Sequence, residues 1–203
     1  MKLYYSPPSP YARKARVAIL ELGLSDRVEE IITPVAPHNP NTKLGLVNPF
    51  MKVPALETDE GFVLFNSPVV CEYLDAKAGG NRLIPAHGEK RWKALRRQAL
   101  GDGILDAALL RRYELVARPQ NLRWPEWLKG QQLKVDYALD VAEREASGWG
   151  KTFDIGDIAM ACALEWLDFR FGHEDWRSIR PRLAEWLARI ALRPSMQKTK
   201  PHE

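Results

Sequence analysis

Cysteine is scarce in this sequence, and its scarcity excludes two classes of protein. Only Cys71 and Cys162 occur among the 203 residues, each in an apolar segment with helical periodicity. Two separated cysteines cannot form a framework of several disulfides, nor the Cys/His ligand set that zinc prefers. Because free cysteine is among the most buried residue types, we expect both thiols to pack in the interior. We expect no bound metal.

Long hydrophobic runs are also missing. No stretch reaches the roughly 18 uninterrupted apolar residues that a membrane-spanning helix needs. The first residues, Met-Lys-Leu-Tyr-Tyr-Ser, run directly into a strand pattern without the apolar segment of a signal peptide. We therefore expect a cytoplasmic protein that does not enter a membrane. Hydrophobic residues still make up 45% of the chain, which is enough for one or two buried cores.

No strong excess of charge of one sign is present either. The net charge is +4, and residues 1–80 hold 8 Lys/Arg against 9 Asp/Glu, so the basic surplus lies in the second part. The basic run at 90–97 has helical spacing and is interleaved with apolar residues. That pattern is typical of a solvated helix face, and no motif for nucleic-acid binding accompanies it. We expect no nucleic-acid partner.

The first part of the chain predicts a strand, a helix and a second strand. Residues 2–5 have strand character, and Ser9-Pro10 is a typical helix start because Ser caps the free amides and Pro fits the first turn. Apolar residues then recur at helical spacing until Gly23, which can take the left-handed conformation that ends a helix. Residues 28–35 follow as the second strand.

A hairpin and a further helix are expected next. After a loop at 36–49, residues 52–57 and 62–65 have strand character on either side of an Asp-Glu-Gly turn. The sequence Asn-Ser-Pro at 66–68 repeats the pattern of a cap followed by proline, and predicts a helix that ends near Gly79. The resulting order, β-α-β followed by β-β-α, indicates an α/β domain.

The remainder of the chain is expected to be helical. Helical periodicity recurs in four segments, at residues 89–115, 124–147, 154–170 and 180–192. The third of these starts with Asp-Ile-Gly-Asp, in which Asp157 can satisfy backbone donors at the helix start. We therefore predict an α/β domain at residues 1–79, a linker at 80–88, and an all-α domain at 89–203.

Three short motifs have the chemistry to hold a ligand. Ser9-Pro10 brings a hydroxyl and backbone N–H groups to a helix start, where the helix dipole favours an anion or a thiolate. Val53-Pro54 can form a cis peptide that leaves the valine backbone free to pair with an extended peptide. Asn66-Ser67 precedes a second helix start that can hold a carboxylate. Taken singly, each motif is explained as well by ordinary capping or by the commoner trans peptide.

Taken together, these motifs resemble those of the bacterial-type glutathione transferase family. The likeness rests on a Ser-Pro turn after the first strand, Val-Pro before the hairpin, and a polar-Ser pair at the start of the next helix. The leader Tyr-Tyr-Ser-Pro-Pro-Ser-Pro-Tyr-Ala-Arg at 4–13 and the run Asn-Pro-Phe-Met-Lys-Val-Pro-Ala-Leu at 48–56 support it, as do length and domain order. The resemblance covers the whole chain and implies a thioredoxin-like α/β domain followed by an all-α helical bundle.

The resemblance also implies which residues hold glutathione. Ser9 would donate a hydrogen bond to the glutathione thiolate, and Val53 would pair with the cysteinyl backbone of the tripeptide. Asn66 and Ser67 would hold the γ-glutamyl end. At Asn66 the family more often has Glu or Gln, so this sequence keeps an amide on a shorter side chain.

Two assignments remain open at this level. Lys52, or less specifically His38 or Lys43 of the preceding loop, can reach a carboxylate of glutathione. Other branches of the family stabilise the thiolate with a Tyr at the end of the first strand, where Tyr5 stands here; we favour Ser9 because the Ser-Pro turn matches better. The turn also resembles a glutaredoxin Cys-Pro-Tyr-Cys motif, but without both cysteines dithiol chemistry is disfavoured.

The activity that the resemblance implies is transfer of glutathione to small electrophiles, as in detoxification, with glutathione as co-substrate. The unidentified electrophile is expected between the domains, near Leu109, Leu110, Arg111, Arg112, Tyr113 and Trp124. The resemblance further implies a homodimer. The alternative is a non-catalytic, glutathione-binding or regulatory member of the same fold, because fold does not settle function.

Overall fold

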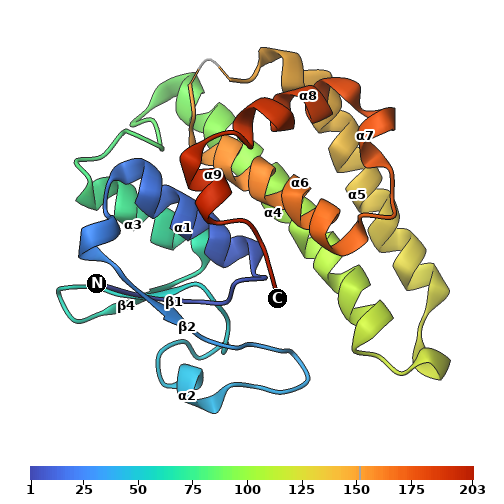
Figure 1. Cartoon of the computed structure of the whole chain (residues 1–203), viewed down its shortest axis with the longest axis horizontal. Helices are drawn as coiled ribbons and strands as arrows, with labels where there is room; N and C mark the ends of the chain where they lie inside the picture. The colour runs from blue at the N-terminus through green and yellow to red at the C-terminus, as the bar shows by residue number, and fades with distance from the viewer. Residues whose placement is uncertain (151) are drawn as a thin grey trace.

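The computed structural model describes residues 1–150 and 152–203. Figure 1 shows a small sheet with helices against it in the first part of the chain, and a bundle of long helices in the rest. This arrangement confirms the predicted thioredoxin-like α/β domain followed by an all-α domain. Within the described ranges, no helix combines the length and apolar character needed to cross a membrane.

Four strands form the sheet, in the order β2-β1-β3-β4. The strands are β1 (Lys2–Tyr5), β2 (Glu29–Ile32), β3 (Ala55–Glu57) and β4 (Val63–Phe65). β1 runs parallel to β2 and antiparallel to β3, which pairs with β4 as the predicted hairpin. Leu3 and Tyr5 of β1 are buried while their neighbours are more exposed, as the alternation of side chains along a strand requires.

Three strands are shorter than the sequence predicted: β4 by one residue, and β2 and β3 by more. β2 ends at Ile32 rather than at residue 35, and β3 begins at Ala55 rather than at residue 52. Pro34 and Pro54 lie just outside these strands, and proline cannot donate a hydrogen bond to a neighbouring strand. The proline positions therefore set the strand ends more closely than the apolar pattern does.

Helices α1 (Pro10–Leu22) and α3 (Ser67–Lys77) pack against each other on one side of the sheet. Gly23 ends α1 in the left-handed conformation, with φ of 69°, as predicted. The loop predicted at 36–49 contains an unpredicted single turn, α2 (Thr42–Gly45), which lies beyond the sheet from α1 and α3 in Figure 1. Short 3₁₀ turns occur at η1 (Ser25–Arg27), η2 (Gln120–Leu122) and η3 (Ala146–Gly148).

The four predicted C-terminal helices are present, each within two residues of its expected ends. They are α4 (Gly88–Val116), α5 (Pro125–Glu145), α6 (Ile155–Phe171) and α8 (Pro181–Ile190). The short helices α7 (Trp176–Ile179) and α9 (Pro194–Lys198) were not predicted. α4 and α6 approach closely, since a Cβ added at Gly101 would lie 2.8 Å from the backbone of Ala159. Small residues are therefore required at this crossing.

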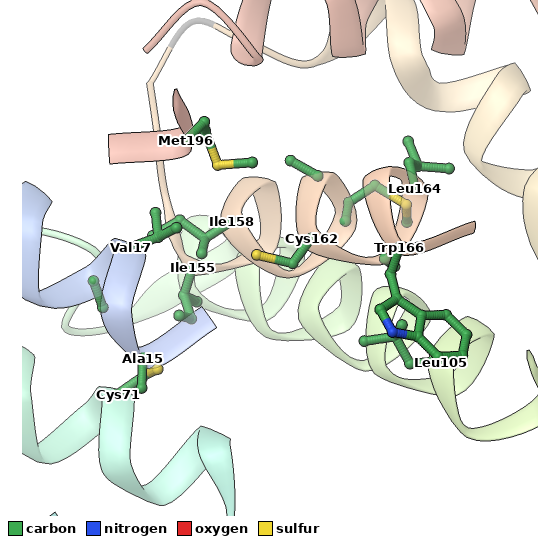
Figure 2. Packing of buried hydrophobic residues seen from close by; sticks show 14 of the residues in the cluster. Ala15, Val17, Cys71, Leu105, Ile155, Ile158, Cys162, Leu164, Trp166 and Met196 are labelled. Carbon is green, nitrogen blue, oxygen red and sulfur yellow. The ribbon is translucent and has the colours of Figure 1, made fainter. Parts of the chain in front are cut away.

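The core joins the two domains around α6, as Figure 2 shows. Val17 of α1 lies beside Ile158 of α6, and Ala15 of α1 lies beside Cys71 of α3. Both cysteines are buried and free, which confirms the expectation that they pack in the interior. Burial raises the pKa of the Cys71 thiol to about 12 and that of Cys162 to about 11. Both thiols therefore stay protonated at neutral pH.

Candidate functional site

The strand register brings the three sequence motifs to one end of the sheet. Tyr4 of β1 lies opposite Ala55 of β3, and Ala55 lies opposite Phe65 of β4. The chain leaves β1 into the Ser-Pro turn, enters β3 from the Val-Pro pair, and leaves β4 into the Asn-Ser pair. All three motifs therefore lie at the same edge, although they are up to about 57 residues apart in the sequence.

Ser9 is the N-cap of α1. Its Oγ accepts a hydrogen bond from the Ala12 amide at 3.2 Å, and its carbonyl accepts one from the Arg13 amide at 3.0 Å. The Ser9 amide donates to the Ser6 carbonyl at 2.9 Å, which fixes the turn. Within the described ranges the half-buried hydroxyl donates to no acceptor, so its hydrogen is free to point at a ligand.

The Val53-Pro54 peptide bond is cis, one of the two conformations that the sequence allowed. Both residues are buried. Asn48, which the sequence analysis did not single out, holds the preceding loop: its Nδ2 donates to the Lys52 carbonyl at 2.7 Å, and its Oδ1 accepts from the Phe50 amide at 3.1 Å. The sequence signal for this role is Asn followed directly by Pro, which favours a turn held by the Asn side chain.

Asn66 and Ser67 start α3 in an unusual way. Asn66 has φ of 72°, a left-handed conformation that Asn tolerates better than most residues, and its side chain is exposed and makes no capping bond. Ser67 is only 2% exposed, and its Oγ has no hydrogen-bond partner among the described residues. A buried hydroxyl without a partner costs about 1–3 kcal/mol, so a ligand that supplies the missing bond would be favoured.

The three basic residues considered for the site are all exposed. Lys52 adjoins the Val-Pro pair and so lies at the same edge of the sheet. His38 and Lys43 belong to the segment around α2, and neither side chain makes a hydrogen bond or ion pair with another residue in the part of the chain that is described. Lys52 is therefore the best placed of the three.

Tyr5, the alternative to Ser9, is buried beneath α1. The Arg16 guanidinium lies over its ring, 4.3 Å from the centroid. Arg16 is held there by an ion pair with Glu30 of β2, in which Nη2 and Oε2 are 2.9 Å apart. The aromatic ring is thus fixed by packing on the side of the sheet that faces α1.

The helical domain closes over the Ser-Pro turn. Trp166 of α6 donates from Nε1 to the Pro8 carbonyl at 3.0 Å, next to Ser9. Tyr11 donates a hydrogen bond to Asp106 of α4. Burial and this hydrogen bond raise the pKa of Tyr11 well above its usual range, so its hydroxyl stays protonated. The turn is therefore fixed from two helices of the second domain, α4 and α6.

Two residues expected at the electrophile site make other contacts. Arg111 is buried, pairs with Glu174 at 2.5 Å between Nη2 and Oε1, and lies 4.4 Å from the centroid of the Phe171 ring. Trp124 is exposed and stacks on Trp127 with ring centroids 6.3 Å apart. Arg111 thus packs α4 against α6, because its charge is neutralised there, and Trp124 lies at the α4–α5 connection.

The other residues expected at the electrophile site lie along the second half of α4. Leu110 is exposed, whereas Leu109, Arg112 and Tyr113 are half-buried. Burial raises the pKa of Tyr113 and lowers that of Arg112.

In the described residues, no group of three or more His, Cys, Asp or Glu side chains has the arrangement of a metal site.

Known proteins match this chain over its whole length. Residues 8–77 match the family model "Glutathione S-transferase, N-terminal domain", and residues 125–189 match "Glutathione S-transferase, C-terminal domain". The chain is 32% identical to the uncharacterized GST-like protein YibF of Escherichia coli strain K12, over 99% of this chain and 98% of that protein.

Two crystal structures of a glutathione transferase family member from Pseudomonas fluorescens Pf-5 are also similar. The one with bound glutathione is 43% identical with a TM-score of 0.96, covering 100% of this chain and 99% of that one. The one with bound S-(propanoic acid)-glutathione is 42% identical with a TM-score of 0.92, covering 99% of each chain.

Proposed function

Because this chain belongs to the glutathione S-transferase family, we propose that it is a transferase that binds glutathione and activates its thiolate for attack on small electrophiles. Glutathione is its co-substrate, and residues 1–79 form the domain that binds it. Bound glutathione in the similar Pseudomonas protein supports the ligand. The alternative is a member of the fold that binds glutathione without turning it over.

The observation that carries the proposal is the unpaired hydroxyl of Ser67. It is buried at the start of α3, where free backbone N–H groups and the helix dipole favour an anion. The γ-glutamyl end of glutathione carries a carboxylate that can accept from this hydroxyl. Asn66 adjoins it with an exposed amide and adds a donor for the same end.

The cysteinyl part of glutathione lies between Val53 and Ser9 in this proposal. Val53 pairs with the backbone of the tripeptide as an added strand, and Pro54 fixes the turn that presents it. Ser9 donates its free hydroxyl hydrogen to the sulfur. Lys52 lies beside them and adds a positive charge for a carboxylate of the ligand.

Activation means lowering the pKa of the glutathione thiol, whose ordinary value is near 8.5. A hydrogen bond from Ser9 and the dipole of α1 both favour the thiolate over the thiol. Tyr5 is disfavoured because its ring is packed beneath Arg16 on the α1 side of the sheet. The thiolate then attacks an electrophile that lies against α4 and α6. Bound S-(propanoic acid)-glutathione in the similar protein supports room for a group on the sulfur.

The assembly that fits this function is a homodimer in the cytoplasm, with the α/β domain of one subunit against the helical domain of the other. Detoxification of reactive small molecules is the corresponding role. Exposed aromatic side chains on both domains support the dimer, among them Phe50 and Trp92.

Calorimetric titration of the full chain with glutathione tests the proposal. Saturable binding is expected, and Ser67→Ala should weaken it about tenfold to a hundredfold, because a hydrogen bond to a charged group contributes roughly 1.5–3 kcal/mol. The same variant should leave the thermal midpoint unchanged or higher, since the hydroxyl it removes has no partner. The exposed Ser147→Ala is the matched control. No binding at millimolar glutathione would overturn the proposal.

A further inference from the structure

Two arginines lie on adjacent turns where α4 packs against α6: Arg112 follows Arg111, whose guanidinium is 4.4 Å from the ring centroid of Phe171, the residue after Arg170. Arg112 is on α4, and Arg170 is near the end of α6. Burial lowers the pKa of Arg112, and the positive charge of Arg170 lowers it further, whereas the negative charge of Glu203 opposes both effects. Arg112 makes no ion pair with any residue in the described ranges. The pair therefore carries more positive charge than its surroundings neutralise.

Arg170 is the more buried of the two. Its side chain is 9% exposed and lies over the Phe169 ring, 4.0 Å from the centroid. Its terminal nitrogens pair with the carboxylate of Glu203. Its Nε is buried and finds no hydrogen-bond partner in the parts of the chain that the structure describes. A buried guanidinium with an unused donor is a feature that an anionic ligand would satisfy.

The two arginines lie beside the turn that presents Ser9. Trp166, one helical turn before Arg170, donates to the carbonyl of Pro8 at 3.0 Å. On α4, Arg112 lies less than two helical turns after Asp106, which accepts a hydrogen bond from Tyr11 of the same turn. A group attached to a sulfur at Ser9 would therefore extend towards this part of the interface.

The partner of Arg170 comes from the segment that follows α9. The segment after α9 starts against α1, where Arg13 donates from Nη2 to the Met196 carbonyl at 3.1 Å. In Figure 1 it then runs past the start of α1 to its end at Glu203. The Glu203 side chain is 76% exposed, so its ion pair is open to exchange with another carboxylate.

We propose that Arg112 and Arg170 bind the carboxylate of an acidic electrophile, and that the Glu203 side chain occupies this position until the substrate displaces it. The inference rests on the proposed glutathione site and names the substrate class of that site. Arg112 and Arg170 supply paired donors for one carboxylate, whose single negative charge offsets part of their joint positive charge. Neutral electrophiles of the same shape gain nothing from these donors.

Haloacids provide the simplest reaction of this class. The glutathione thiolate attacks the carbon that carries the halogen, the S–C bond forms, and the carbon–halogen bond breaks as halide leaves with the electron pair. The thiol proton passes to solvent. Iodoacetate and iodoacetamide undergo this same step and differ only in the charge of the remote group. The buried, protonated thiols of Cys71 and Cys162 should not compete for these reagents.

Binding of the two products tests the inference without depending on turnover. Calorimetric titrations would compare S-(carboxymethyl)glutathione with its neutral counterpart S-(carbamoylmethyl)glutathione, with glutathione itself as reference. We expect the acid to bind about tenfold tighter than the amide, and Arg112→Gln to abolish that difference while leaving the amide unchanged. The control is Arg96→Gln, an exposed arginine near the other end of α4. It should change neither affinity.

Glu203→Gln tests the displacement step. Removing the competing carboxylate should tighten binding of the acid about threefold or more and leave binding of the amide unchanged; unchanged or weaker binding of the acid would contradict a competitor role.

If glutathione binds but acid and amide bind equally, and Arg112→Gln shifts neither, the anion site is refuted while the glutathione site stands. If glutathione does not bind, both fall. In each variant, the initial rate above the uncatalysed background should be higher with iodoacetate than with iodoacetamide wherever the acid product binds more tightly than the amide product.

Discussion

Two charged residues of α1 are buried and join the two domains, although charged side chains usually face solvent. Arg13 and Lys14 of α1 are almost completely buried. Arg13 pairs with Glu165 at 2.5 Å, and Lys14 pairs with Asp102 at 2.7 Å, so both tie the α/β domain to the helical domain. Removing one partner of a buried pair costs about 3–5 kcal/mol, because the other charge is left without compensation. Sequence alone predicts exposure for such residues, since their partners lie about 88 residues or more away.

The two cysteines provide the prediction at this scale. Cys71→Ala with Cys162→Ala should leave glutathione binding and conjugation nearly intact, because both thiols are buried in the core. Stability should fall by about 1–3 kcal/mol through lost packing. Urea unfolding and initial rates would measure the two effects separately. Loss of activity in a variant that remains folded would mean that one cysteine takes part in the chemistry.

At the scale of elements, the sequence predicts best where local signals agree. Ser9-Pro10 and Gly23 mark the two ends of α1, and the capping box of Asp154 and Asp157 marks the start of α6, all as expected. The short helices α2, α7 and α9 were missed because one or two turns have no apolar period to detect. The sequence does not predict the hydrogen bonds of the candidate site either. The bond from Asn48 to Lys52 and the unpaired hydroxyl of Ser67 depend on the folded loop.

The start of α6 yields a pH prediction. Burial and the negative charge of Asp154 raise the pKa of Asp157 to about 6, from 3.8. The folded chain therefore binds a proton that the unfolded chain has released, and the stability contributed by Asp157 falls as pH rises from about 4 to about 6. Asp157→Asn removes this titration. Its destabilisation should be larger at pH 4 than at pH 7, by about 1–3 kcal/mol.

Urea unfolding at several pH values would measure this difference. At pH 7 the Asn variant should still lose about 1–2 kcal/mol, because Asp157 also accepts from the Asp154 amide and pairs with Arg97. Asp26→Asn, an exposed site in η1, is the control and should show no such trend. A destabilisation that is constant with pH, or larger at pH 7, would contradict the assigned pKa.

At the scale of the whole molecule, both domains expose large apolar side chains. Phe50, Phe62 and Val69 are exposed on the α/β domain, and Trp92 is 68% exposed near the start of α4. In a dimer with two-fold symmetry, a contact between one patch of the first subunit and a different patch of the second occurs twice. These side chains fit the proposed contact between the α/β domain of one subunit and the helical domain of the other.

Light scattering at micromolar concentration should therefore find a dimer. Trp92→Glu should shift the protein towards monomer, because it would bury a charge at the interface. Trp124→Glu changes a tryptophan of similar exposure at the α4–α5 connection and should leave the dimer intact. A monomeric wild-type protein, or equal effects of both variants, would refute this arrangement.

The most direct test of the central claim is the ultraviolet absorbance of the glutathione thiolate, titrated against pH in the saturated protein. We expect a midpoint at least about one pH unit below that of free glutathione, and a rise of about one to two units in Ser9→Ala, since each unit corresponds to about 1.4 kcal/mol. Affinity for S-methylglutathione should stay unchanged. A titration that Ser9→Ala leaves unmoved but Tyr5→Phe shifts upward would assign the role to Tyr5. A bound thiol that titrates like free glutathione would contradict thiolate activation altogether.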